Sequence, residues 1–187
     1  MANKSYILWS VAVIALFGVL KLFAPLVPYG NDIAAIIAVS FQLYVPLWQG
    51  YQFAWPSDWR RDLLRLITIS IVTFVPYVIF YIYMSPHFAW RMPSNLIEII
   101  LLNFLIVALP EEIFYRGFLQ PKLGIILVNV VFALAHWVGE YDLVRLLPFF
   151  PGLVFSYLTY RSKSITSAVI YHALCNILSE ILFASSL

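Results

Sequence analysis

Residues 96–119 have the sequence LIEIILLNFLIVALPEEIFYRGFL. An α-helix rises about 1.5 Å per residue, so about 20 mostly apolar residues are enough to cross the hydrocarbon core of a bilayer. Charged groups are rare at that depth, because each costs about 2.5–3.5 kcal/mol to insert. Glu111, Glu112 and Arg116 nevertheless stand close together in this apolar run. The stretch therefore predicts a membrane-crossing helix that carries a functional polar cluster.

The chain as a whole is also strongly apolar. Of its 187 residues, 63% are hydrophobic and 11% are charged, and the mean hydropathy is +0.91, whereas a soluble domain has about 25% charged residues. The lipid bilayer is therefore the expected solvent. The apolar runs are continuous and lack the alternation of β-barrel strands, which favours helices. The sequence predicts an all-α membrane protein, a polytopic bundle of about seven transmembrane helices, at residues 6–23, 32–48, 63–84, 96–119, 122–137, 143–160 and 165–183.

We expect these spans to form a single transmembrane domain over residues 1–187. Within it, residues 1–95 would supply the first three spans with their loops, and residues 96–187 the four spans that carry the polar motifs. The first apolar run lacks a small-x-small cleavage pattern, so it is expected to be a retained span and not a signal peptide.

Local signals suggest where the fourth span begins and ends. Asn95 and Glu98 have the spacing of a capping box, in which Asn95 would be the N-cap residue. Pro121 is expected to break the chain before the fifth span, because proline has no amide hydrogen to donate within a helix.

The distribution of basic residues predicts the orientation. We assign the N-terminus and the even-numbered loops to one side of the membrane. That side then carries eight basic residues and the other side carries three. The eight are Lys4, Arg60, Arg61, Arg65, Arg116, Lys122, Arg161 and Lys163. The positive-inside rule then places the N-terminus in the cytoplasm and the C-terminus outside. The net charge of +2 is too small to suggest a nucleic-acid partner.

Helical spacing separates the roles of the two glutamates. Glu112 and Arg116 are four residues apart, in the favourable order for an ion pair. Glu111 is turned about 100° away on the helix and has no such local partner. It is therefore the free carboxylate and a candidate general base, supported by the neighbouring pair.

Two further spans carry polar stripes. Phe132 and His136 share one face of the fifth span, with Asn129 about one turn along it. His172 and Asn176 share one face of the seventh span. Because lipid cannot satisfy polar groups, we expect these stripes to face each other and the glutamates.

These groups suggest hydrolysis of a peptide bond. Glu111, assisted by His136, would deprotonate a water molecule that attacks the scissile carbonyl, and His172 and Asn176 would donate hydrogen bonds to the oxyanion. This chemistry needs no serine or cysteine nucleophile, and Cys175 is interpreted as a packing residue.

Three motifs in this order resemble the CPBP family, which contains the type II CAAX prenyl proteases and bacteriocin-processing proteins. They are a Glu-Glu-x-x-x-Arg motif, a Phe-x-x-x-His motif and a His-x-x-x-Asn motif, formed by Glu111, Glu112 and Arg116, by Phe132 and His136, and by His172 and Asn176. The resemblance covers about residues 101–183. It implies a glutamate-dependent intramembrane endopeptidase with no obligatory metal.

The resemblance also implies a substrate that is tethered to the membrane. The chain is shorter than eukaryotic prenyl proteases, which favours a compact prokaryotic member that acts on a leader peptide, a C-terminal sorting tail or a CAAX-like end. Phe132 is expected to support the site through packing. The sequence leaves the oligomeric state open.

Two other functions remain possible at this stage. One is a zinc-dependent intramembrane metalloprotease with Glu111, His136 and His172 as ligands, although these lie on three helices and no HExxH motif is present. The other is a transporter or scaffold without enzymatic activity, because intramembrane carboxylates and histidines also form proton relays. The chain lacks the inverted repeats typical of many transporters.

Overall fold

The structure is a computed structural model, and it is helical, as the sequence predicts. It describes residues 4–85, 88–140 and 142–185, and no strand occurs in these ranges. Large apolar side chains are exposed along many of the helices, as expected for surfaces that face lipid. Within the described ranges, five segments are long and apolar enough to cross a membrane: Lys4–Leu26, Gly30–Trp48, Trp59–Met84, Leu143–Ser162 and Thr166–Ser185. The chain is therefore an integral membrane bundle, whereas the predicted count of seven spans is not confirmed.

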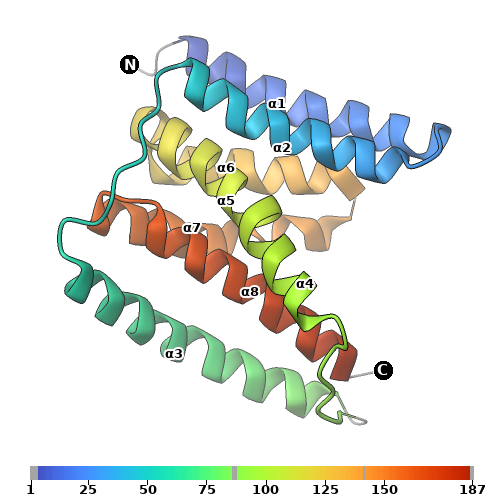
Figure 1. Cartoon of the computed structure of the whole chain (residues 1–187), viewed down its shortest axis with the longest axis vertical. Coiled ribbons are helices and arrows are strands. Elements are labelled where there is room, and N and C mark those ends of the chain that lie inside the picture. Colours follow the sequence, from blue (N-terminus) through green and yellow to red (C-terminus); the bar gives the residue numbers. More distant parts are fainter. Residues whose placement is uncertain (1–3, 86–87, 141, 186–187) are drawn as a thin grey trace.

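The first two helices form an antiparallel pair along one edge of the bundle (Figure 1). α1 (Lys4–Phe23) and α2 (Gly30–Trp48) are connected through a 3₁₀ turn, η1 (Ala24–Leu26). A Cβ atom at Gly30 would lie 1.9 Å from the carbonyl oxygen of Ala24. Only glycine therefore permits this turn, which sets α2 against α1.

Residues 96–119 form one helical rod whose type changes along its length. The rod consists of α4 (Leu96–Leu101), the π-helical η2 (Leu102–Ala108), α5 (Leu109–Glu112) and the π-helical η3 (Ile113–Leu119). π-turns are rare and occur frequently at functional sites. Here they flank the short α5, which carries Pro110 and both glutamates. Asn95 does precede the rod, but its side chain makes no capping hydrogen bond, so the predicted capping box is wrong.

The chain breaks at Gly124 and not at Pro121, which corrects the sequence prediction. α6 (Gln120–Glu140) contains a non-helical residue at Gly124, with a φ of 80°. Residues 120–123 continue the preceding rod. A positive φ is open to glycine at no steric cost, so the change of direction falls there, three residues after the expected position.

The last two helices complete the core of the bundle. After the 3₁₀ turn η4 (Leu143–Leu146), α7 (Phe149–Ser162) and α8 (Thr166–Ser185) form a helical hairpin. Large side chains are buried where η3, α6, α7 and α8 meet, including Phe114, Tyr115, Phe132, Phe155 and Leu158. The predicted polar motifs lie on η3, α6 and α8 and on the adjoining α5, which carries both glutamates.

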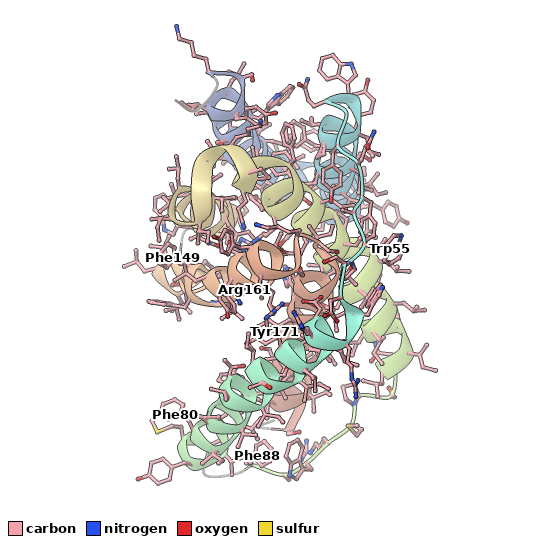
Figure 2. The ribbon with its side chains drawn as sticks, turned by 90° about the vertical axis from the view of Figure 1, so that its left-hand side faces the viewer. Trp55, Phe80, Phe88, Phe149, Arg161 and Tyr171 are labelled. Carbon is pink, nitrogen blue, oxygen red and sulfur yellow. The ribbon has the colours of Figure 1, made fainter. Side chains whose placement is uncertain are left out.

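α3 (Trp59–Met84) lies at the opposite edge of the bundle from α1 and α2 (Figure 1). The segment 49–58, which carries Trp55, runs along one end of the bundle to reach it, and Arg161 of α7 lies at that same end (Figure 2). Two polar contacts connect α3 to α8. The buried Asp62 carboxylate accepts a hydrogen bond from the Ser167 hydroxyl, and the hydroxyls of Thr73 and Tyr171 lie 2.6 Å apart.

Candidate active site

Arg116 lies at the centre of the buried polar cluster. Both its side chain and that of Glu112 are 0% exposed, and Arg116 Nη1 donates to Glu112 Oε1 at 3.1 Å. Arg116 Nη2 donates to Asn129 Oδ1 at 3.0 Å and to the carbonyl oxygen of Gly152 at 3.3 Å. The ion pair predicted from the spacing is therefore confirmed. The guanidinium also connects η3 to α6 and α7.

Asn129 is held in place from two sides. Its amide nitrogen donates to the Ser156 hydroxyl and to the Ile125 carbonyl, both at 2.8 Å. A Cβ atom at Gly152 would lie 2.4 Å from Asn129 Oδ1 and 2.9 Å from Arg116 Nη2. The close approach of α7 to Arg116 thus requires glycine at position 152.

His172 contacts both glutamates through different ring nitrogens. Its Nδ1 lies 2.9 Å from Glu112 Oε1, and its Nε2 lies 3.8 Å from Glu111 Oε2. A carboxylate oxygen of an ionised glutamate can only accept, so the Nδ1 of His172 carries a proton. The side chain is 5% exposed, against 12% for Glu111. Glu111 is therefore the more accessible of the two carboxylates.

Two phenylalanine rings enclose these charged groups. The Phe132 and Phe155 ring centroids lie 4.3 Å and 4.9 Å from the guanidinium carbon of Arg116. The Phe155 ring also stacks on the imidazole of His172, with centroids 4.5 Å apart and planes at 16°. Such faces stabilise a cation through their quadrupole and exclude water from it. Phe132 thus supports the cluster through packing.

His136 reaches the cluster only indirectly. Its Nδ1 lies 2.9 Å from the carbonyl oxygen of Phe132, and its ring packs on the Phe132 ring at 4.4 Å. Because a carbonyl can only accept, Nδ1 carries the proton and Nε2 of the neutral ring is free to accept one. Asn176 is half-buried on α8, one turn beyond His172. Among the residues that the structure describes, no hydrogen bond connects His136 or Asn176 to a glutamate.

The structure therefore arranges the predicted residues differently from the sequence analysis. It brings Glu111, Glu112, Arg116 and His172 into one contact network, with Phe132 against it. The sequence paired Glu111 with His136, whereas the structure places His172 next to Glu111. The parts of the network that the sequence missed are the Asn129 and Gly152 contacts to Arg116. A polar residue inside an apolar span, such as Asn129, was the available signal.

Two carboxylate atoms of the cluster are buried without a hydrogen-bond partner. These are Oε2 of Glu111 and Oε2 of Glu112. Buried polar atoms are generally satisfied in native proteins, so these two oxygens are acceptors that the described side chains leave open. Within the described residues, no group of three or more His, Cys, Asp or Glu side chains is arranged to hold a metal ion.

A cavity of about 500 Å³ reaches Arg116 from the end of the bundle that holds segment 49–58. Its lining includes Tyr51, Gly117, Gln120, Thr159 and Lys163. Burial raises the pKa of Tyr51, which lies outside the membrane-spanning helices, to about 12. Its volume falls within the range of about 300–1,000 Å³ that is typical of small-ligand sites. Neither glutamate nor His136 nor His172 is among the residues that line it.

Comparison with known proteins supports the interpretation of these motifs. Residues 93–178 match the family described as type II CAAX prenyl endopeptidase Rce1-like. No curated protein matches the chain, and no solved structure does. The matched region begins just before α4 and ends within α8, so it contains every residue of the cluster described above. Residues 93–178, a little under half of the chain, are thus similar to the Rce1-like type II CAAX prenyl endopeptidases, a group of the CPBP family.

Proposed function

We propose that this protein is a glutamate-dependent intramembrane endopeptidase. The family supports CAAX-type endopeptidase activity, and the observation that carries the glutamate mechanism is the His172 ring held between the two carboxylates. One carboxylate, Glu112, is fully buried and neutralised by Arg116. The other, Glu111, is partly accessible and has an unpaired oxygen. That division is the one expected for a supporting residue and a base.

In the proposed reaction, Glu111 takes a proton from water as the water oxygen forms a bond to the scissile carbonyl carbon. The Nε2 of His136, unprotonated when the ring is neutral, assists in removing that proton. When the tetrahedral intermediate collapses, the carbon–nitrogen bond breaks and the proton on Glu111 passes to the departing amine. No covalent intermediate with the enzyme forms.

His172 and Asn176 are the proposed donors to the oxyanion. Because Nδ1 of His172 already donates to Glu112, a second donation from Nε2 requires the ring to carry both protons. The cluster is then neutral: the carboxylates of Glu111 and Glu112 balance Arg116 and the charged imidazole. A positive donor in a dry site stabilises a developing oxyanion strongly.

The proposed substrate is a protein or peptide tethered to the membrane, with a leader, a C-terminal sorting tail or a CAAX-like end as the cleaved element. We propose that the N-terminus is cytoplasmic and the C-terminus outside, in a prokaryotic inner membrane. The opposite placement of the two chain ends along the bundle is compatible with that topology (Figure 1).

The decisive experiment is the Glu111→Gln substitution. Cleavage of a farnesylated peptide with a CAAX end, and of endogenous membrane peptides compared by mass spectrometry, should fall by about 10³-fold, in the range expected for loss of a general base. Glu98→Gln is the matched control, because Glu98 is an exposed carboxylate on the same rod. Full cleavage by a folded Glu111→Gln protein would refute the proposed role.

We further propose that the reaction uses no metal ion. Purified protein analysed for bound metals should then lack stoichiometric zinc, and o-phenanthroline should leave cleavage unchanged. Tightly bound zinc, together with activity that is lost on its removal and restored on its return, would establish the metalloprotease alternative that uses Glu111, His136 and His172.

A further inference from the structure

The proposed catalytic carboxylate and two neighbouring side chains each have a buried polar atom without a hydrogen-bond partner. These atoms are Glu111 Oε2, the Tyr115 hydroxyl oxygen and Gln42 Nε2. Tyr115 is 0% exposed and Gln42 is 2% exposed. Other buried polar side chains behave differently: the hydroxyl of Tyr171 pairs with Thr73, and the amide of Asn103 donates to Glu180. Buried atoms without a partner also occur elsewhere, at Ser70, Gln120 and Thr159. The group at Glu111 differs in that it combines a carboxylate, a phenol and an amide on packed elements.

The three groups come together from two halves of the chain. Tyr115 follows Glu111 by four residues, so both lie on one face of the α5–η3 rod. α2, which carries Gln42, packs directly against α5 and η3, and the neighbouring rings of Phe41 and Phe114 lie 5.6 Å apart. The Tyr115 hydroxyl interacts electrostatically with Glu111, and the side chain of Gln42 lies within reach of a hydrogen bond to it. No hydrogen bond with good geometry closes between them.

Three buried polar groups without hydrogen-bond partners would destabilise a core whose only role is packing. Each buried polar group left unsatisfied costs about 1–3 kcal/mol. A leucine in place of Gln42 and a phenylalanine in place of Tyr115 would avoid that cost at similar volume. The three atoms instead offer one acceptor, one donor and one group that serves as either. This set complements a single water molecule, which donates two hydrogen bonds and accepts two.

We propose that Gln42 and Tyr115 are positioning residues that hold the hydrolytic water against Glu111. The inference rests on the proposed function, and it extends the active site beyond residues 93–178, because Gln42 lies outside the region that matches the family. Water then donates one hydrogen to the carboxylate and accepts from the amide or the phenol. Its remaining lone pair is thereby aimed at the scissile carbonyl.

The test compares Gln42→Leu and Tyr115→Phe with the wild-type protein on the farnesylated CAAX peptide. We expect kcat to fall roughly 10- to 100-fold, less than the 10²–10³-fold loss of an oxyanion donor, while KM changes by less than about threefold. The melting temperature in detergent should stay the same or rise, because each substitution removes an unpaired polar atom.

The matched control is Tyr171→Phe, which removes a buried hydroxyl that does have a partner. It should lower the melting temperature and leave kcat unchanged. A Tyr115→Phe protein that behaves in the same way has lost only a structural group, and this result overturns the inference.

The two proposals fail differently. If Glu111→Gln abolishes cleavage while Gln42→Leu and Tyr115→Phe keep wild-type kcat, the proposed function stands and the water site is wrong. If the Glu111→Gln protein cleaves normally, the proposed function is wrong, and the proposed water site, which depends on it, is wrong as well.

Discussion

At the scale of single residues, the Glu112–Arg116 pair explains how charge is tolerated in the core. Taking an ion pair out of water is unfavourable unless further hydrogen bonds satisfy both partners. Arg116 gains such bonds with Asn129 and the Gly152 carbonyl, and Glu112 gains one with His172. Arg116 Nε and Glu112 Oε2 stay without a partner among the described residues. The pair thus fixes the position of the imidazole, which in turn lies next to Glu111.

A double-mutant cycle on this pair is the first prediction. Removing one partner leaves the other charge buried alone, so Glu112→Gln and Arg116→Met should each lower the free energy of unfolding by about 3–5 kcal/mol. The double variant should lose clearly less than the sum, because neither charge remains. Chemical denaturation in mixed micelles measures the three differences. Additive losses would show that the two side chains do not interact.

The sequence predicted part of this network for a clear physical reason. The Glu112–Arg116 contact depends only on helical spacing, which is local. The contacts of Arg116 to Asn129 and Gly152 depend on how three separate elements pack, and no local rule contains that information. The same limit applies to His172. Its position beside Glu111 follows from the approach of α8 to α5, whereas helical spacing could show only that it shares a face with Asn176.

At the scale of elements, the break within α6 shows which residue determines where the chain changes direction. The sequence analysis expected Pro121 to end the fourth span, but proline lacks only one amide donor and its φ is compatible with a helix. The chain changes direction at Gly124, which has a φ of 80°. The positions of the helices themselves were predicted closely, because apolar runs and turn residues are strong signals.

Substitutions at these two positions test that explanation. Gly124→Ala should lower the free energy of unfolding by about 1–2 kcal/mol, because an L-residue is strained at positive φ. No atom lies within 4 Å of an added Cβ there, so the loss has no steric component. Pro121→Ala should change the free energy by less than about 0.5 kcal/mol, as an exposed substitution. Equal effects of the two variants would contradict this account.

Tyr51, in the segment between α2 and α3, should make the stability of the fold depend on pH. The Tyr51 ring packs on η3 at Gly117, where a Cβ atom would lie 2.6 Å from the ring. Burial raises the pKa of Tyr51 from 10.0 to about 12. Between these values the unfolded chain loses the proton while the folded chain keeps it, so stability falls as pH rises from 10 toward 12 and is unaffected below 10.

The measurement is the unfolding midpoint as a function of pH for wild type and Tyr51→Phe. The variant should show a shallower decline in the alkaline range, and the slopes should agree at neutral pH. Parallel curves over the whole range would mean that the hydroxyl of Tyr51 is not shielded by the fold.

At the scale of the whole molecule, each helix of the N-terminal half packs on a different part of the C-terminal half. α1 packs on α6, α2 on α5 and η3, and α3 on α7 and α8. The motif-bearing elements are therefore enclosed from two opposite edges (Figure 1). α3 is the least buried of the five apolar segments. Its attachment depends on few contacts, and the polar ones carry particular weight.

The Asp62–Ser167 hydrogen bond is the contact whose loss should affect the attachment of α3 most. Ser167→Ala leaves the buried Asp62 with Arg65 as its remaining partner, 3.2 Å away, and an unsatisfied carboxylate oxygen costs about 1–3 kcal/mol. The first turns of α3 should then exchange amide hydrogens faster in nanodiscs, with no change in α1 and α2. Arg61→Ala is the control, because its pair with Asp58 is 83% exposed on the arginine side and such pairs contribute little. If exchange in α3 is the same for both variants, apolar packing alone holds this helix to the bundle.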